Sequence, residues 1–323
     1  MTERTNWYLN LSYVCNERCT FCAAELASGS LQIDGRPAIV SKADVERWLD
    51  GARPRPGDRV MLAGGEPTLH AELVPIVELL RGAARVDLFT NALRLADVAY
   101  ADAVTAAGVT DYEVALYGAD APSHEAVTRR RGSFEQTLDA LAVLAAQREH
   151  FDVRVNVRLL VSRQSAASNP AIVRLVHDRG LRVDSFSLER LILSADAKAA
   201  GAEISWAEAA PSINESAALV RALGYGLRFD AVPLCVFTGA NAEHVRAHLH
   251  ESTQRDRATQ RYLDPYVAAG RPEVAPARRR ALPDPCVPCA YRNVCGRVER
   301  WYLHRYGVEG LRTVADHVAA TNR

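Results

Sequence analysis

Two patterns of apolar residues alternate along the first two thirds of the chain. Short runs rich in β-branched side chains are typical of buried strands, and apolar positions that recur every three or four residues are typical of amphipathic helices. Strands are expected at residues 7–14, 58–62, 85–89, 112–116, 153–161 and 183–191. Helices are expected between them at residues 43–50, 71–82, 95–107, 134–148 and 171–179.

Strands that alternate with helices pair in parallel through right-handed crossovers, so the pattern predicts an α/β fold. Periodicity alone does not separate a closed or partial barrel from an open sheet. Ser133, followed three positions later by Gln136, predicts a capping box at the start of the fourth of these helices.

The alternation ends after residue 191. A helix is expected at residues 206–223, a strand at 226–232, a helix at 240–258, and helices again at 297–306 and 311–320. Residues 262–285 are rich in Pro, Ala and Arg and are expected to form a connection. We therefore place a domain boundary near residue 225, with a core at residues 1–225 and a smaller domain at 226–323.

Composition and charge narrow the class of protein. Hydrophobic residues make up 48% and charged residues 24% of the 323, which is ordinary for a globular protein with a substantial core. The 39 basic and 39 acidic residues balance, so charge gives no reason to expect nucleic acid or an acidic membrane as a partner. No apolar run approaches the ~20 residues of a membrane span, and no signal peptide is recognisable, so a cytoplasmic location is expected.

The seven cysteines fall into two groups. Cys15, Cys19 and Cys22 lie near the start of the chain, and Cys235, Cys286, Cys289 and Cys295 lie near its end. An odd number in two tight groups is a poor disulfide framework, and in a cytosolic protein it indicates metal binding or catalysis.

The first group follows the first expected strand. Three thiolates at the spacing of Cys15, Cys19 and Cys22 can hold three irons of a [4Fe–4S] cluster, whereas self-contained clusters use four cysteines. One iron is then left open for a substrate or cofactor. A zinc knuckle would need four nitrogen or sulfur ligands, and the nearest histidine, His70, lies beyond a strand and a helix.

Cys-x3-Cys-x2-Cys after the first strand, with Phe21 before the last cysteine, resembles the radical S-adenosylmethionine (SAM) superfamily. Residues 64–67, Gly-Gly-Glu-Pro, resemble the family segment that receives the SAM ammonium. Glycines allow close backbone approach, and a carboxylate can pair with an ammonium. The resemblance covers residues 7–192 and implies a partial (β/α)6 barrel with ligands at the carboxyl ends of its strands. It also implies that SAM chelates the open iron and is cleaved to a 5′-deoxyadenosyl radical.

The resemblance assigns SAM contacts to seven residues: Phe21, Gly64, Gly65, Glu66, Pro67, Asn91 and Asn156. The chain departs from the family pattern at Ala92, where a glycine is common. Ala115 and Tyr117 also depart from a Ser-Leu-Asp-Gly stretch, so a serine contact to SAM at position 115 is lost.

The second cysteine group resembles the auxiliary-cluster domains called SPASM or twitch. Together with Cys235, the cysteines at 286, 289 and 295 supply four thiolates, enough for one saturated [4Fe–4S] cluster or one zinc ion. The family context favours iron and sulfur. The full SPASM pattern would place a further cysteine where Glu299 stands, so one auxiliary cluster in a shortened domain is expected. If only three thiolates bind, Cys235 becomes a free thiol.

Charged residues on the expected barrel strands are candidates for substrate contacts, because burying charge without a partner is costly. Alternation places Arg154, Asn156 and Arg158 on one face of the fifth strand. The substrate candidates are Arg154, Arg158 and Arg190, and the catalytic candidates are Glu189, as a base, and Tyr117.

The auxiliary-cluster subgroup either modifies peptides or oxidises and epimerises small molecules. The early position of Cys15 and the single auxiliary cluster favour a small molecule, such as a sugar or aminocyclitol in antibiotic biosynthesis. The lack of cysteines between Cys22 and Cys235 favours two-electron oxidation over epimerisation, with a flavodoxin- or ferredoxin-type reductant. A peptide maturase that forms a cross-link and an epimerase using Cys235 as hydrogen donor remain alternatives. An iron–sulfur electron carrier or a zinc-bound interaction module is the non-enzyme alternative.

Overall fold

The fold is organised around one parallel sheet. The computed structural model describes residues 5–22, 32–33, 36–37, 39–248, 259–263, 280–295 and 298–315. Within these residues eight strands form the sheet in the order β10-β1-β4-β5-β6-β7-β8-β9, and every neighbouring pair is parallel. The strands are β1 (Thr5–Ser12), β4 (Arg59–Gly64), β5 (Arg85–Thr90), β6 (Val109–Ala115), β7 (Arg154–Val161), β8 (Ser185–Arg190), β9 (Gly226–Asp230) and β10 (Thr259–Leu263).

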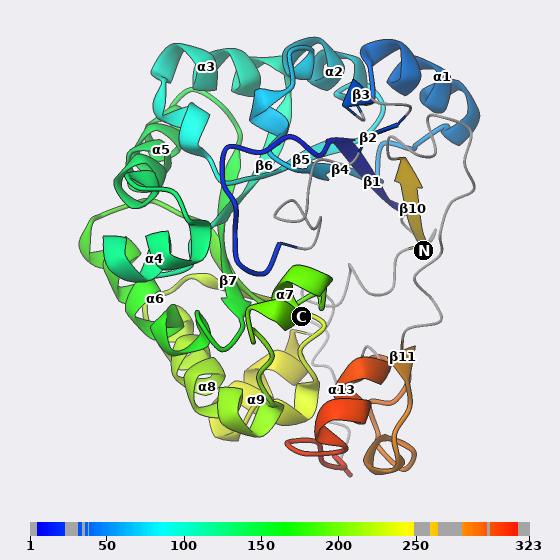
Figure 1. Cartoon of the computed structure of the whole chain (residues 1–323), viewed down its shortest axis with the longest axis vertical. Helices are drawn as coiled ribbons and strands as arrows, with labels where there is room; N and C mark the ends of the chain where they lie inside the picture. The colour runs from blue at the N-terminus through cyan, green and yellow to red at the C-terminus, as the bar shows by residue number, and fades with distance from the viewer. Residues whose placement is uncertain are drawn as a thin grey trace.

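The helices of the described residues are α1 (Lys42–Ala52), α2 (Leu73–Leu80), α3 (Val98–Ala107), α4 (Ala121–Thr128), α5 (Ser133–Gln147), α6 (Asn169–Asp178), α7 (Ala195–Ala199), α8 (Trp206–Ala222), α9 (Gly239–Ala247) and α13 (Arg300–Tyr306). Short 3-10 turns occur at η1 (Pro67–Leu69), η2 (Leu93–Ala96), η3 (Ala166–Ser168), η4 (Leu234–Val236) and η6 (Asp284–Cys286). Two ribbons complete the described structure, β2 (Gln32–Ile33) with β3 (Arg36–Pro37) and β11 (Arg280–Ala281) with β12 (Val298–Glu299). Most of the helices lie along the outside of the sheet, whereas α7 lies on its inner side and α13 lies beside β11 in the C-terminal region (Figure 1). The predicted α/β fold with a partial barrel and a small cysteine-rich C-terminal region is confirmed.

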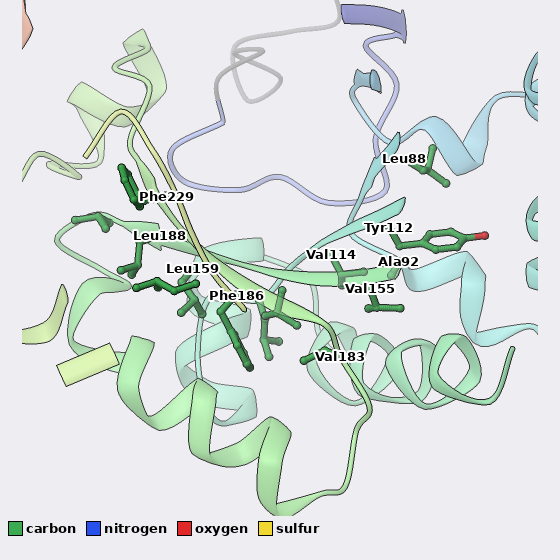
Figure 2. Packing of buried hydrophobic residues seen from close by; sticks show 14 of the residues in the cluster. Leu88, Ala92, Tyr112, Val114, Val155, Leu159, Val183, Phe186, Leu188 and Phe229 are labelled. Atoms are coloured by element: carbon green, nitrogen blue, oxygen red, sulfur yellow. The ribbon is translucent and has the colours of Figure 1, made fainter. Parts of the chain in front are cut away.

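The hydrophobic core lies between the sheet and the outer helices. Val114, Val155, Leu159, Phe186 and Leu188 come from three adjacent strands and are fully buried on the helix-facing side (Figure 2). Burying one such side chain contributes about 1.5–3 kcal/mol. Because side chains alternate along a strand, the intervening residues face the opposite side, the lumen of the barrel.

The six strands and five helices predicted up to residue 191 are confirmed, with shifts of a few residues at their ends. The predicted capping box at Ser133 is wrong. Ser133 is the first residue of α5, its N-cap is Gly132 in a left-handed conformation, and no side chain caps it. The Ser133 hydroxyl instead donates to the Arg130 carbonyl at 2.8 Å. Capping boxes do form at the N-termini of α1 and α8.

Two strands extend the sheet beyond the expected six. β9, expected as the start of the second domain, pairs with β8, so the sheet continues past residue 225 and the boundary placed there stays a proposal. β10 was not predicted, because its residues fell at the edge of the expected connection at 262–285; it pairs in parallel with β1.

Two expected C-terminal helices are only partly within the described residues. Of the helix expected at 240–258, α9 covers the first part, and residues 249–258 lie outside the described structure. Residues 311–315 are not helical, and the rest of the helix expected at 311–320 lies outside it as well. Among the helices that are described, none is long and apolar enough to cross a membrane.

Candidate functional site

The loop that carries the first three cysteines runs from the end of β1 across the inner side of the barrel (Figure 1). Its backbone is fixed by the end of α4, because Arg18 N donates to Thr128 O at 2.9 Å and Thr20 N donates to Val127 O at 3.0 Å. The last carbonyls of a helix have no partner within the helix, so they can anchor a neighbouring loop. Residues 15–22 are thereby held at the carboxyl end of the strands.

Hydrogen-bond donors approach the first thiol. The backbone N–H of Glu17 lies 3.4 Å from Sγ of Cys15, and Nδ2 of Asn91 lies 3.9 Å from the same sulfur. Burial raises the pKa of the Cys15 thiol to about 12, and the Glu17 amide opposes that rise. Metal ligation requires the thiolate, which such donors stabilise. The donor set of Cys15, Cys19 and Cys22 therefore fits three iron ligands of one cluster.

Phe21 anchors the same loop through apolar contacts. Its side chain is 5% exposed and packs edge-to-face on Tyr117, with ring centroids 5.2 Å apart. Val127 and Leu191 belong to the same apolar cluster. Phe21 thus joins the loop to α4 and to the end of β8, and Tyr117 serves as its packing partner. Burial raises the pKa of Tyr117 well above its ordinary value, so its phenol stays protonated.

The two glycines at the end of β4 are required by close backbone packing. A Cβ on Gly64 would lie 2.2 Å from the Ser12 carbonyl oxygen, and a Cβ on Gly65 would lie 2.2 Å from the Val14 carbonyl oxygen. Gly64 also has φ of +120°, a conformation that residues with a side chain rarely adopt. Gly65 N donates to Ser12 O at 2.7 Å, and Glu66 N donates to Val14 O at 2.8 Å, so the end of β4 is joined to the end of β1 and to the cysteine loop.

Glu66 is buried, 1% exposed, and its carboxylate joins the ends of β4 and β5. Oε1 accepts from Thr68 N at 3.0 Å, from the Thr68 hydroxyl at 2.7 Å and from the Thr90 hydroxyl at 2.7 Å. Oε2 accepts from Asn91 N at 2.7 Å. Burial raises the pKa of Glu66, and these donors oppose the rise. Because each carboxylate oxygen has about two acceptor positions, Oε2 retains one for a further donor. Its predicted contact with the SAM ammonium stays a prediction.

Six of the seven residues predicted to bind SAM lie at this end of the barrel. Asn91 donates from Nδ2 to Oδ1 of Asn16 at 2.7 Å, which ties the end of β5 to the cysteine loop. Pro67 begins η1 directly after Glu66. Asn156 lies deeper, on β7, where it belongs to a different network.

Polar side chains from β6 to β9 form a connected network in the lumen. Asn156 donates to the Glu113 carboxylate and, at 3.1 Å, to the Ser187 hydroxyl. Ser187 donates to Oε1 of Glu189 at 2.8 Å, and Arg158 Nε donates to Oε2 of Glu189 at 2.9 Å. Four of these side chains are essentially buried, and Arg158 is 28% exposed. The predicted residues Asn156, Arg158 and Glu189 are therefore brought together.

Arg158 stabilises Glu189 as a carboxylate, and Glu189 in turn holds the pKa of the guanidinium above its usual range. The Arg158 guanidinium also lies over the Phe89 ring, 4.8 Å from its centroid. A carboxylate paired in this way is a weaker base than an unpaired one. Its role as a base stays a prediction.

Arg228 is a lumen residue that the sequence analysis missed. Its Nη2 lies 2.9 Å from Oε1 of Glu113, whose side chain is fully buried. Arg228 sits on β9, which was assigned to the second domain, so it was not considered with the barrel strands. The signal that could have found it was Glu113 itself, an acidic residue on the fourth expected strand, because a buried carboxylate requires a cation or hydrogen-bond donors nearby.

Arg154 is not brought to the site. It is the first residue of β7 and lies at the opposite end of the strand from the cysteine loop. Its Nε donates to Oδ1 of Asp111 at 2.8 Å, and Arg85 pairs with the same carboxylate at 3.0 Å. Arg154 and Arg158 point to the same face of β7, but the strand is long enough for their side chains to lie at different ends of the barrel.

Arg190 points away from the lumen toward the C-terminal region. It follows Glu189 at the end of β8, and its Nη2 lies 2.9 Å from Oε1 of Glu299 on β12. The structure therefore separates the substrate candidates Arg158 and Arg190, which lie on different sides of the sheet.

The four C-terminal cysteines line one cavity. Three come from residues 286–295, and Cys235 comes from η4, which follows β9. Leu234 N donates to Sγ of Cys295 at 3.5 Å, so this site also supplies an amide to a sulfur. Four thiols from two distant segments around one cavity fit the donor set of a saturated cluster. Across the described residues, no three Cys, His, Asp or Glu side chains are gathered closely enough to be assigned to a single metal ion.

Comparison with known proteins assigns the core. Residues 9–160 match the family model of the radical SAM superfamily. The match identifies residues 9–160 as a radical SAM segment. The predicted recognition of the cysteine motif is thereby confirmed, and the match implies a [4Fe–4S] cluster and SAM as cofactors.

The chain spans about a third to a half of the length of the curated relatives it matches. GTP 3′,8-cyclase of Synechococcus elongatus is 35% identical over 155 residues, which are 47% of this chain and 45% of that protein. Molybdenum cofactor biosynthesis protein moc-5 of Caenorhabditis elegans is 27% identical over 186 residues, 57% of this chain and 30% of that protein.

Solved structures share the fold over a larger part of the chain. Streptococcus suis SuiB bound to S-adenosylmethionine has a TM-score of 0.62 at 12% identity and covers 97% of this chain and 77% of its own. The structure of anSMEcpe with bound AdoMet and a Cp18Cys peptide has a TM-score of 0.51 at 15% identity and covers 70% of this chain and 63% of its own.

Proposed function

We propose that this radical SAM enzyme oxidises a small-molecule substrate by two electrons, with an electron acceptor held in the C-terminal cysteine cavity. The observation that supports this most directly is the cavity itself, because Cys235, Cys286, Cys289 and Cys295 all line it. Four thiolates saturate a [4Fe–4S] cluster, which suits it to electron transfer. When bound, the first cluster and SAM supply the one-electron reduction and the hydrogen-abstracting radical of the family.

The protein's own residues hold and orient these groups. Cys15, Cys19 and Cys22 bind the first cluster, while Asn91 and the Glu66 carboxylate shape the neighbouring SAM site. Arg158 and Glu189 line the lumen as a paired cation and anion, which can exchange hydrogen bonds with hydroxyl and amino groups. A sugar or aminocyclitol-like molecule offers such groups.

Oxidation of an alcohol carbon to a carbonyl removes one hydrogen atom, one electron and one proton. Glu189 is the proposed proton acceptor, and its carboxylate is held in orientation by Ser187, which donates to its other oxygen. The electron that remains on the substrate radical passes to the acceptor held in the C-terminal cavity. A flavodoxin- or ferredoxin-type protein is the proposed reductant of the first cluster.

A peptide maturase is the second candidate. The observation that favours it is the similarity in fold to SuiB, a structure of which is described as bound to precursor peptide SuiA; that structure has a TM-score of 0.55 and covers 85% of this chain. The epimerase alternative requires Cys235 to donate hydrogen in the barrel, and its position in the C-terminal cavity argues against that role.

Product mass and solvent labelling test the proposal. A panel of sugars, aminocyclitols and peptides is incubated with SAM and dithionite in deuterium oxide. The proposal expects a small-molecule product lighter by two hydrogens, one 5′-deoxyadenosine per product, and loss of product in Cys289→Ala. A product of unchanged mass with one carbon-bound deuterium would instead establish epimerisation. A peptide lighter by two hydrogens would establish cross-linking.

A further inference from the structure

The β11–β12 ribbon separates the cysteine cavity from the barrel. Ala281 and Val298 pair across the ribbon and line the four-cysteine cavity. The next pair is Arg280 and Glu299. Because successive side chains of a strand point to opposite faces, Arg280 and Glu299 project from the other face of the ribbon.

Glu299 meets the end of a barrel strand on that face. Its Oε1 lies 2.9 Å from Nη2 of Arg190, the last residue of β8, and 3.5 Å from Nε of Arg280. The side chains of Arg190 and Glu299 are only 10% and 13% exposed, so solvent screens this pair weakly. It is thus a buried contact between the core sheet and the cysteine-rich region.

Arg190 depends on Glu299 as its counter-charge. Nε and Nη1 of Arg190 are buried and have no hydrogen-bond partner within the described residues. Burial lowers the pKa of Arg190. Among the neighbouring charges, Glu299 opposes this fall most strongly and Asp230 opposes it less, whereas Arg280 lowers the pKa further. Removing one partner of a buried ion pair leaves an uncompensated charge, which is strongly unfavourable.

The same strand end reaches the lumen. Glu189 precedes Arg190 and turns to the opposite side, where it holds Arg158. Two adjacent residues of β8 therefore connect the lumen with the ribbon that borders the cysteine cavity.

We propose that Glu299 is a positioning residue: by pairing with Arg190, it fixes the four-cysteine cavity against the end of β8 and so sets the separation between substrate and electron acceptor. The inference rests on the proposed function, since it concerns the path of the second electron. Glu299 stands where the SPASM pattern has a cysteine, and this chain uses that position for an ion pair.

The test compares Glu299→Gln, which loses the charge and keeps the size, with Glu299→Asp, which keeps the charge. Glu215→Gln is the matched control, because the Arg174–Glu215 pair has a 2.8 Å separation but side chains 51% and 53% exposed. Full-length protein is reconstituted with iron and sulfide and reduced with dithionite. Deuterium uptake is followed in residues 280–295 and 298–306, and the magnetic interaction between the two reduced clusters is measured by electron paramagnetic resonance.

For Glu299→Gln we expect about tenfold faster deuterium uptake in these segments. We also expect a weaker interaction between the clusters, with iron content and 5′-deoxyadenosine release from SAM unchanged. Glu299→Asp should recover part of both effects, and Glu215→Gln should behave like the wild type. If Glu299→Gln does not fold, Arg190→Lys, which keeps the charge but loses the planar fork, should show the same exchange phenotype. The inference is overturned if Glu299→Gln takes up deuterium at the wild-type rate. If Glu299→Gln does not fold, the same result in Arg190→Lys overturns it.

Failure of the proposed function gives a different result. If the C-terminal cavity does not hold the acceptor, Cys289→Ala retains product formation, whereas the exchange measurement still reports on Glu299. If Glu299 has no positioning role, Cys289→Ala loses product while Glu299→Gln exchanges like the wild type.

Discussion

The backbone N–H of Asn91 donates a 2.7 Å hydrogen bond to Oε2 of Glu66, which joins the carboxyl ends of β5 and β4 beneath the cysteine loop. The carboxylate accepts three more hydrogen bonds through Oε1. Glu66 therefore has a structural task at the position where the family motif predicts a contact with SAM.

The first prediction separates these two tasks of Glu66. Glu66→Ala leaves four buried donors without an acceptor, so we expect a loss of about 3–5 kcal/mol in the free energy of unfolding. Thr90→Val removes one of the hydrogen bonds to Glu66 and the bond that Ala92 N donates to the Thr90 hydroxyl, so it should cost about 2 kcal/mol. Urea unfolding of the two variants checks these values, and equal losses in both would contradict the central role of Glu66.

Binding of SAM by the same variants is measured under conditions in which they are folded. If Glu66 also contacts the ammonium, Glu66→Ala should bind SAM at least tenfold more weakly, equivalent to about 1.4 kcal/mol, whereas Thr90→Val should remain near wild type. Unchanged SAM affinity in folded Glu66→Ala would show that the carboxylate acts only through the fold.

The second prediction concerns the close packing of β4 against the cysteine loop. Gly65→Ala would place a methyl group 2.2 Å from the Val14 carbonyl oxygen, so the loop must move. We expect a loss of about 3 kcal/mol in stability together with weaker retention of the first cluster. Gly57→Ala is the control, since its added methyl group meets nothing within 4 Å. Similar iron content and stability in the two variants would show that Gly65 is not packed tightly against the Val14 carbonyl.

The third prediction concerns pH. His124 is buried, and burial lowers its pKa to about 4 from 6.5, with Glu125 opposing the shift. Between these values the unfolded chain binds the proton more readily than the folded one, so stability is present above about pH 6.5 and is lost as pH falls. The full effect is on the order of 3 kcal/mol.

Urea unfolding of wild type and His124→Gln at a series of pH values checks this linkage. Removing the imidazole should flatten the slope of stability against pH in the range from about 6.5 downward. Equal slopes in the two proteins would mean that other groups account for the acid sensitivity.

The fourth prediction concerns metal content. Anaerobically reconstituted protein should contain about eight irons per chain, and replacing Cys15, Cys19 and Cys22 together with alanine should leave about four. Replacing Cys235 with alanine should lower iron in the second site, because this thiol shares a cavity with the other three. Zinc in place of the second set of irons would refute the two-cluster assignment, and full iron retention in Cys235→Ala would exclude that thiol as a ligand.

The sequence by itself determined the features that depend on neighbouring residues, namely the strands, the helices and the first cysteine motif. The apolar runs predicted the strands because alternation is set by a backbone period that needs no tertiary information. The spacing of Cys15, Cys19 and Cys22 and the Gly-Gly-Glu-Pro segment identified the family because the ligands of one cluster lie on one loop. The capping box at Ser133 failed because a left-handed Gly132 began the helix instead, and a short polar motif does not reveal that competition.

Relationships between distant segments were decided only by the tertiary structure. The sequence grouped Cys235 with the other three C-terminal cysteines but left open whether it joins them, and the structure places it in their cavity. The pairing of Arg228 on β9 with Glu113 was not predicted at all. Arg154 and Arg158 share a strand face, yet the length of β7 carries one to a salt-bridge network at the amino end and the other into the lumen. The period of a strand fixes which way a side chain points, whereas the packing of the whole sheet fixes what it meets there.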